Sequence, residues 1–129
     1  MTELDVRRES WPIRGTFAIS RGSRTATEVV VAALRRDGHT GRGECVPYPR
    51  YGETVEGVMA DIESLRVRLA GGLDREGLQT ALPAGAARNA LDCAFWDLEA
   101  KRAGKRAFEL AGLPAPKPLV TAYTLSLDA

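Results

Sequence analysis

The segment Ser20–Thr25 is the first part of the chain that could bind a charged substrate. It reads Ser-Arg-Gly-Ser-Arg-Thr, so Arg21 and Arg24 lie around a flexible glycine. A planar guanidinium group donates two parallel hydrogen bonds to a carboxylate, which suits an acidic ligand. The residues alone leave two interpretations open: a carboxylate-binding loop and, as the simpler one, a solvated hairpin loop. The segment lacks the Gly-x-x-Gly spacing of a phosphate-binding loop.

A second candidate is Glu44–Glu53, which reads Glu-Cys-Val-Pro-Tyr-Pro-Arg-Tyr-Gly-Glu. It combines two prolines, two tyrosines and several charges at a predicted corner between a strand and a helix. Such a segment could form the wall of a pocket and exclude water from it. It could equally be a stiff turn whose tyrosines pack on the helices.

Two acidic residues on one predicted helix have a simpler explanation than catalysis. Arg88 precedes Asp92 by four residues, and Lys101 follows Asp97 by four. Oppositely charged side chains at this spacing are neighbours on a helix surface and pair there. We therefore expect both aspartates to form structural ion pairs.

The composition is that of an ordinary globular protein of one domain. The 129 residues are 44% hydrophobic and 27% charged, with a net charge of +1. This charge gives no reason to expect a nucleic acid or an anionic membrane as partner. We see neither the apolar core of a signal peptide at the start nor a run long enough to cross a bilayer.

The thiols and the single histidine do not form a metal-binding pattern. Cys45, Cys93 and His39 are too few and too scattered for a structural zinc site. We expect two reduced thiols in a cytoplasmic protein, with Cys93 buried as a small apolar residue.

The elements that must position these segments are strands first and helices afterwards. Three strands are predicted as an antiparallel meander, with the turn Asp37-Gly38 between the last two. Helices follow, and the prolines at 114, 116 and 118 indicate a linker. The predicted strands cover 4–13, 27–35 and 40–46, and the predicted helices begin at the N-cap Thr54 and cover 55–69, 75–81, 84–103 and one turn at 107–111. Strands followed by helices predict an α+β fold, here a three-stranded meander followed by a helical bundle.

Three segments together resemble one enzyme family. Residues 17–25 (FAISRGSRT), 43–53 (GECVPYPRYGE) and 82–101 are similar to the dipeptide epimerases of the L-Ala-D/L-Glu epimerase group. This group belongs to the mandelate racemase and muconate lactonizing subgroup of the enolase superfamily. The resemblance follows the chain in order and covers nearly all of it. The pattern Ala87–Lys101 alone would indicate only the superfamily.

The resemblance implies a fold and a domain organisation. Residues 1–116 correspond to the N-terminal capping domain, which covers a (β/α) barrel in the family. Residues 117–129 correspond to a linker and the first barrel strand, for which 119–127 is the strand-like segment. We expect the remainder of the barrel to be absent from this chain.

The resemblance also implies a reaction and its site. The family interconverts L-Ala-L-Glu and L-Ala-D-Glu by abstracting the α-proton through an enolate, with Mg2+ held by three carboxylates and two lysines as bases. None of these catalytic residues or metal ligands is in this chain, so we expect the chain alone to be inactive. The substrate, a small acidic dipeptide, would be contacted by Arg21 or Arg24, by Tyr51, and by Thr124 on the barrel side.

The resemblance extends to the setting of the whole enzyme and leaves alternatives. It implies a homo-oligomer that acts in cytoplasmic turnover of cell-wall peptides, with no nucleic-acid or membrane partner. One alternative is the capping domain of another superfamily branch, such as muconate cycloisomerase or o-succinylbenzoate synthase. Another is a free-standing module that binds acidic peptides or assembles into oligomers.

Overall fold

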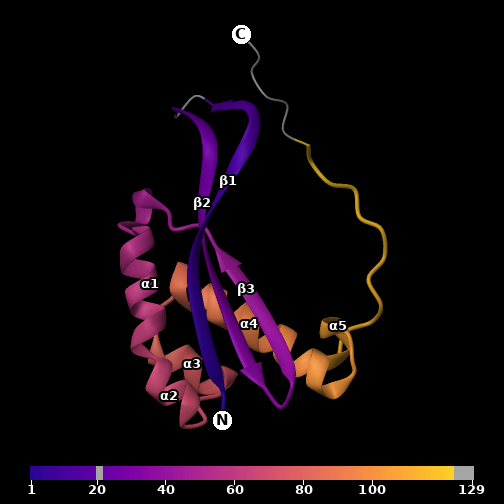
Figure 1. Ribbon diagram of the computed structural model, residues 1–129. Coiled ribbons are helices and arrows are strands. Elements are labelled where there is room, and N and C mark those ends of the chain that lie inside the picture. The colour runs from indigo at the N-terminus through magenta and orange to yellow at the C-terminus, as the bar shows by residue number, and fades with distance from the viewer. Residues whose placement is uncertain (20–21, 124–129) are drawn as a thin grey trace.

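The computed structural model describes residues 1–19 and 22–123, and its helices lie against one face of an antiparallel sheet (Figure 1). The strand order is β1-β2-β3, so each strand pairs with its neighbour in sequence. This arrangement confirms the predicted α+β class. The elements are β1 (Glu3–Ile19), β2 (Gly22–Arg36), β3 (His39–Cys45), the 3-10 turn η1 (Pro49–Tyr51), α1 (Val55–Ser64), α2 (Arg66–Ala70), α3 (Arg75–Ala81), α4 (Ala86–Ala103) and α5 (Ala107–Leu110).

The first hairpin is much longer than its sequence pattern predicted. β1 has 17 residues and β2 has 15, and their far end projects beyond the helices (Figure 1). The pairing continues through Pro12 and then shifts register between Pro12 and Phe17. Proline is tolerated there because β1 is an edge strand, whose outward N–H groups need no ladder partner. The expected loop at 20–25 is therefore wrong over Gly22–Thr25, which belong to β2.

Local signals predicted most of the element ends correctly. Asp37 and Gly38 form the second turn with φ of 51° and 77°, and the side chain of Thr54 caps α1 by accepting from the N–H of Gly57 at 3.0 Å. Gly104 ends α4 in the left-handed region, as expected of a helix C-terminus. The predicted continuous helix over 55–69 is wrong, because the chain breaks at Leu65 into α1 and α2.

Helix α4 touches β3 almost backbone to backbone. A Cβ added to Gly43 would lie 1.9 Å from the carbonyl oxygen of Ala90, and one added to Gly41 would lie 2.1 Å from that of Ala94. Such distances are far inside van der Waals contact, so only glycine fits at positions 41 and 43 of β3. The sequence had suggested that these glycines weaken β3 or mark a bulge. The observed reason is the approach of the helix.

Polar side chains of α4 also bind the open edge of β3. Asp97 accepts from the backbone N–H of Arg42 at 2.8 Å, and Lys101 donates to the carbonyl of Thr40 at 2.8 Å. The predicted Asp97–Lys101 ion pair is confirmed, at 2.7 Å. Covering an edge strand in this way satisfies backbone groups that would otherwise be available to another chain.

The predicted Arg88–Asp92 ion pair is wrong. Arg88 instead donates to the backbone carbonyls of Gln79 and Leu82, at 3.2 and 3.4 Å. Asp92 accepts from the side-chain amide of Gln79 at 2.9 Å. Both side chains thus hold α3 and the connection that follows it, and helical spacing alone could not show this because α3 lies outside the pattern of α4.

The chain after α5 leaves the sheet and the helices (Figure 1). Residues 113–123 have no regular secondary structure and are exposed, as expected of the predicted linker. The barrel strand expected at 119–127 has no strand pairing over 119–123, and its remaining positions lie outside the described residues. It stays a prediction. Within residues 1–19 and 22–123 the structure has no helix of the length and apolarity needed to span a bilayer.

The two cysteines have opposite environments, and the expectation that Cys93 is buried is wrong. Cys93 is exposed because it falls outside the apolar stripe of α4, while Cys45 is buried beside β2. Burial, followed by the charge of Glu53, raises the pKa of the Cys45 thiol from 9.0 to about 11. Folding therefore favours the protonated thiol over the thiolate. The contribution of this preference to the free energy of unfolding is complete below pH 9 and is lost as the pH rises through about 11.

Replacing Gly43 with alanine should strongly destabilise the domain. The new methyl group must displace the backbone of α4, which we expect to cost about 3 kcal/mol or more in free energy of unfolding. Chemical denaturation followed by circular dichroism measures this directly. Arg42→Ala, the next residue on the same strand, should change stability by less than about 0.5 kcal/mol. Equal stability of Gly43→Ala and the wild type would contradict the close contact between the backbones of α4 and β3.

Thiol labelling should separate the two cysteines. At pH 8 a chromogenic disulfide reagent should modify one thiol per folded chain quickly, and a second only in denaturant, because the reagent reaches exposed Cys93 but not buried Cys45. Cys93→Ser should abolish the fast phase. A fast phase that survives in Cys93→Ser would show that Cys45 is accessible and would contradict its described burial.

Candidate functional site

The segment Tyr48–Gly52 forms a tight turn between β3 and α1. The N–H of Tyr51 donates to the carbonyl of Tyr48, and the N–H of Gly52 donates to that of Pro49, both at 2.9 Å. Gly52 has φ 75° and ψ 14°, a left-handed conformation that glycine adopts without steric cost. This confirms the predicted corner between a strand and a helix.

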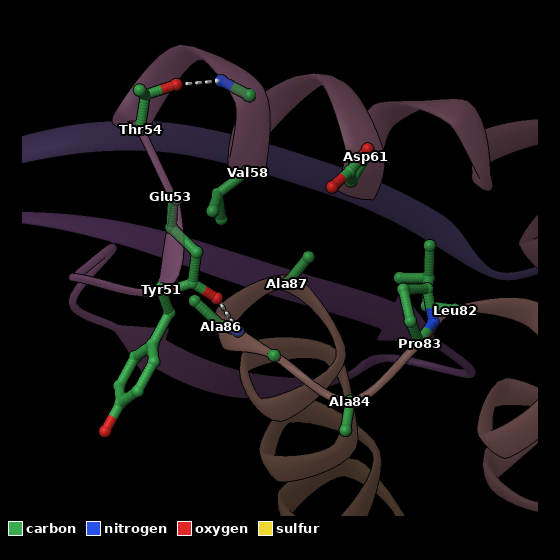
Figure 2. A pocket seen from close by; sticks show the side chains of 13 residues that line it. Tyr51, Glu53, Thr54, Val58, Asp61, Leu82, Pro83, Ala84, Ala86 and Ala87 are labelled. Atoms are coloured by element: carbon green, nitrogen blue, oxygen red, sulfur yellow. Dashed lines mark hydrogen bonds between the residues drawn. The ribbon is translucent and has the colours of Figure 1, made fainter. Parts of the chain in front are cut away.

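The two tyrosines of this turn contact one another. Their ring centroids are 5.6 Å apart with the planes inclined at 46°. Tyr48 is half-buried, whereas Tyr51 is 76% exposed and points away from the helices (Figure 2). Tyr51 is therefore free to meet a ligand or another part of the protein. The alternative that both tyrosines pack on the helices does not hold for Tyr51.

A cavity of about 250 Å³ lies between this turn, the start of α1 and the connection from α3 to α4 (Figure 2). Two carboxylates, Glu53 and Asp61, lie in a lining that is otherwise apolar, apart from backbone and the hydroxyl groups of Tyr51 and Thr54. The lining residues are Tyr51, Gly52, Glu53, Thr54, Gly57, Val58, Asp61, Leu82, Pro83, Ala84, Gly85, Ala86 and Ala87. An adjoining hollow shares Tyr51, Glu53, Gly85 and Ala86.

Glu53 connects the two sides of this cavity. One carboxylate oxygen accepts from the N–H of Ala86 at 2.8 Å, and the other accepts from the N–H of Tyr48 at 3.0 Å. The first of these bonds is drawn in Figure 2. Sequence reasoning missed this role. The signal was the start of α4, where Gly85 has no side chain to cap the helix and the first turn contains no acidic residue.

The structure places one predicted site residue beside the cavity and another away from it. Tyr51 lines it, as the pocket-wall interpretation expected. Arg24 lies exposed on β2 opposite Phe17 and does not line it. Within the described part of the chain, Arg24 forms no ion pair. Arg21 and Thr124 lie outside the described residues, so the substrate site formed by these four residues stays a prediction.

The carboxyl groups with shifted pKa values belong to structural contacts. The Arg7 side chain lowers the pKa of Glu9, and the Arg66 side chain lowers that of Glu63. Glu28 has its pKa lowered first by a hydrogen bond from Ser10 and then by one from Arg8. These groups lie on the sheet and on α1, where solvated ion pairs of this kind contribute little to stability.

No group of three or more metal-binding side chains comes together anywhere in residues 1–19 and 22–123. The two carboxylates of the cavity do not change this, since Glu53 is occupied by two backbone N–H groups. The described residues therefore do not fit a divalent metal site.

Residues 1–112 match the family model of the mandelate racemase / muconate lactonizing enzyme N-terminal domain. The chain is 50% identical over 125 residues to the L-Ala-D/L-Glu epimerase of Escherichia coli, which covers 97% of this chain and 39% of that protein. A solved enolase family member from Agrobacterium tumefaciens, described as homologous to dipeptide epimerases with L-Ala-L-Glu bound and a loop ordered, is 55% identical with a TM-score of 0.91. That match covers 99% of this chain and 39% of the other.

A more distant structure shows how the group varies. The dipeptide epimerase of Methylococcus capsulatus, solved with Mg and L-Arg-D-Lys, is 30% identical with a TM-score of 0.71, over 85% of this chain and 34% of that one. The chain therefore spans less than two-fifths of the length of these relatives. The matched residues 1–112 of this chain include the sheet, the helices and the Tyr48–Gly52 turn.

Proposed function

Because the chain belongs to the mandelate racemase / muconate lactonizing enzyme family, whose N-terminal domain it matches over residues 1–112, we propose that it is the substrate-specificity domain of a dipeptide epimerase. The enzyme would interconvert L-Ala-L-Glu and L-Ala-D-Glu. The observation that carries this proposal is the 55% identical relative with a TM-score of 0.91, which was solved with L-Ala-L-Glu bound.

The proposed substrate is taken from two relatives of this chain. The relative at 50% identity is an L-Ala-D/L-Glu epimerase, and the relative at 55% was solved with L-Ala-L-Glu bound, whereas the Methylococcus relative at 30% was solved with a dibasic dipeptide. An acidic substrate needs a cationic contact, and a guanidinium group is suited to a side-chain carboxylate. The proposed contacts are Arg21 and Arg24. Arg24 is exposed and forms no ion pair among the described residues.

The proposed reaction inverts the carbon next to the terminal carboxylate of the dipeptide. Its proton is very weakly acidic, so the negative charge that develops on the carboxylate oxygens must be stabilised. Mg2+, which is present in the Methylococcus relative, supplies this stabilisation when bound. Its ligands and the bases would come from the rest of the enzyme, because the described residues contain no suitable cluster.

The role of this chain would be to bind and orient the substrate and to exclude water. The Tyr48–Gly52 turn presents Tyr51 as part of a wall, and the hairpin presents Arg24. A site closed against water strengthens every electrostatic interaction within it. The proposal includes action in the cytoplasm on peptides from cell-wall turnover, which rests on the family resemblance.

The whole enzyme and this chain should differ in catalysis. Full-length protein with Mg2+ and L-Ala-L-Glu in deuterated water should exchange the glutamyl α-proton and form L-Ala-D-Glu, whereas the 129-residue chain should do neither. Proton NMR measures the exchange, and chiral chromatography measures the L-Ala-D-Glu formed. Exchange by the 129-residue chain, or a full-length protein that leaves Ala-Glu unchanged, would refute the proposal.

Substitution of the hairpin arginines should identify the substrate. In the full-length enzyme, the more important of Arg21→Ala and Arg24→Ala should lower kcat/KM for L-Ala-L-Glu roughly 10- to 100-fold, as expected for a lost charged hydrogen bond. Arg68→Ala, on the exposed surface of α2, serves as the control and should have no effect. If neither hairpin substitution affects Ala-Glu, another branch of the superfamily becomes the better assignment.

A further inference from the structure

Glu53 joins two parts of the chain that are distant in sequence. Its carboxylate accepts from Tyr48 in its own turn and from Ala86, which is 33 residues further along. A carboxylate is an acceptor with two oxygens, and here each oxygen serves a different segment. The side chain is half-buried, so these bonds are partly protected from water.

The other capped helices show that this arrangement is unusual within the domain. α1 and α3 are capped by the residues that immediately precede them, since Thr54 accepts from Gly57 and Asp74 accepts from the N–H of Gly77. α4 begins after Gly85 and has no such cap. Its first N–H groups have no acceptor inside the helix, and its positive dipole end favours an anion. Glu53 supplies that anion from a different segment.

The start of α4 is shaped to admit this carboxylate. A Cβ added at Gly85 would lie 3.0 Å from the Oε1 atom of Glu53, closer than most such contacts. Glycine at this position therefore allows the approach. A local cap would require a larger residue at position 85, which the position of Glu53 disfavours.

The same side chain closes the Tyr48–Gly52 turn. The carbonyl of Tyr48 accepts from the N–H groups of Tyr51 and of Glu53, at 2.9 and 3.4 Å, while its own N–H donates to the Glu53 carboxylate. Tyr48 is thus held on both sides of its backbone. Since its ring contacts that of Tyr51, the direction of Tyr51 depends on the same bonds.

We propose that Glu53 is a positioning residue, which fixes the Tyr48–Gly52 turn against the start of α4 and thereby sets the direction in which Tyr51 faces the substrate. The catalytic consequence rests on the proposed function, but the structural consequence does not. A residue that only capped α4 would leave the turn unchanged when removed. A positioning residue would release it.

Amide hydrogen exchange in the 129-residue chain distinguishes these roles. In Glu53→Ala and the nearly isosteric Glu53→Gln, the amides of Tyr51 and Gly52, which donate to Tyr48 and Pro49 and not to Glu53, should exchange on the order of tenfold faster. Asp74→Ala removes a helix cap elsewhere and is the matched control. It should affect α3 and leave the turn unchanged. Wild-type exchange at Tyr51 and Gly52 in both Glu53 variants would overturn the proposal.

Steady-state kinetics of the full-length enzyme test the catalytic consequence. Glu53→Gln should raise KM for L-Ala-L-Glu roughly tenfold while kcat changes less than about threefold, because the loss is in substrate orientation and binding. Asp74→Ala should change neither constant. An active wild type with an unchanged KM in Glu53→Gln would overturn the proposal. A wild type without activity would refute the proposed function, while the exchange experiment would still decide the role of Glu53.

Discussion

The contact between α4 and β3 is the constraint on which the rest of the domain depends. Glycine at 41 and 43 lets the helix backbone lie against the strand, and any side chain there would enter the carbonyl groups of Ala90 or Ala94. At this short distance the side chains of Asp97 and Lys101 reach the backbone of β3. Hydrophobic burial therefore brings the layers together, and the edge hydrogen bonds fix how the helix lies along the strand.

Helix α4, fixed in this way, contacts a different turn at each of its ends. Near its C-terminus, Arg102 donates to Asp37 in the turn between β2 and β3, at 2.7 Å. At its N-terminus, the N–H of Ala86 holds the carboxylate of Glu53. The position of the Tyr48–Gly52 turn relative to the sheet is thus held by α4, a helix of 18 residues, as well as by the short segment that joins the turn to β3. Regular elements provide more exact positions for site residues than loops do.

The sequence could predict the features that depend on neighbouring residues. The bounds of α3, the cap of α1 and the Asp37-Gly38 turn all arise from local backbone preferences. It could not predict that Glu53 caps α4 or that Asp92 binds Gln79, because these contacts join separate elements. The extension of the hairpin was missed because Pro12 usually ends a strand, and an edge position removes that objection. The sequence predicted the corner that contains the Tyr48–Gly52 turn, but not the hydrogen bonds to Glu53 that hold it against α4.

The two segments proposed to contact substrate are held in different ways, and this difference has a physical consequence. Residues 10–18 and 22–26 include no buried side chain, so the outer hairpin is stabilised by strand pairing and not by the core. Changing Arg24 there leaves the packing of α4 on β3 untouched. The Tyr48–Gly52 turn, by contrast, is tied to α4 through Glu53, so a change that moved it would also expose the start of that helix. Under the proposed function, the hairpin is therefore the segment in which a new substrate charge would be accommodated at little cost in stability, while the turn would preserve the geometry against which that substrate is oriented.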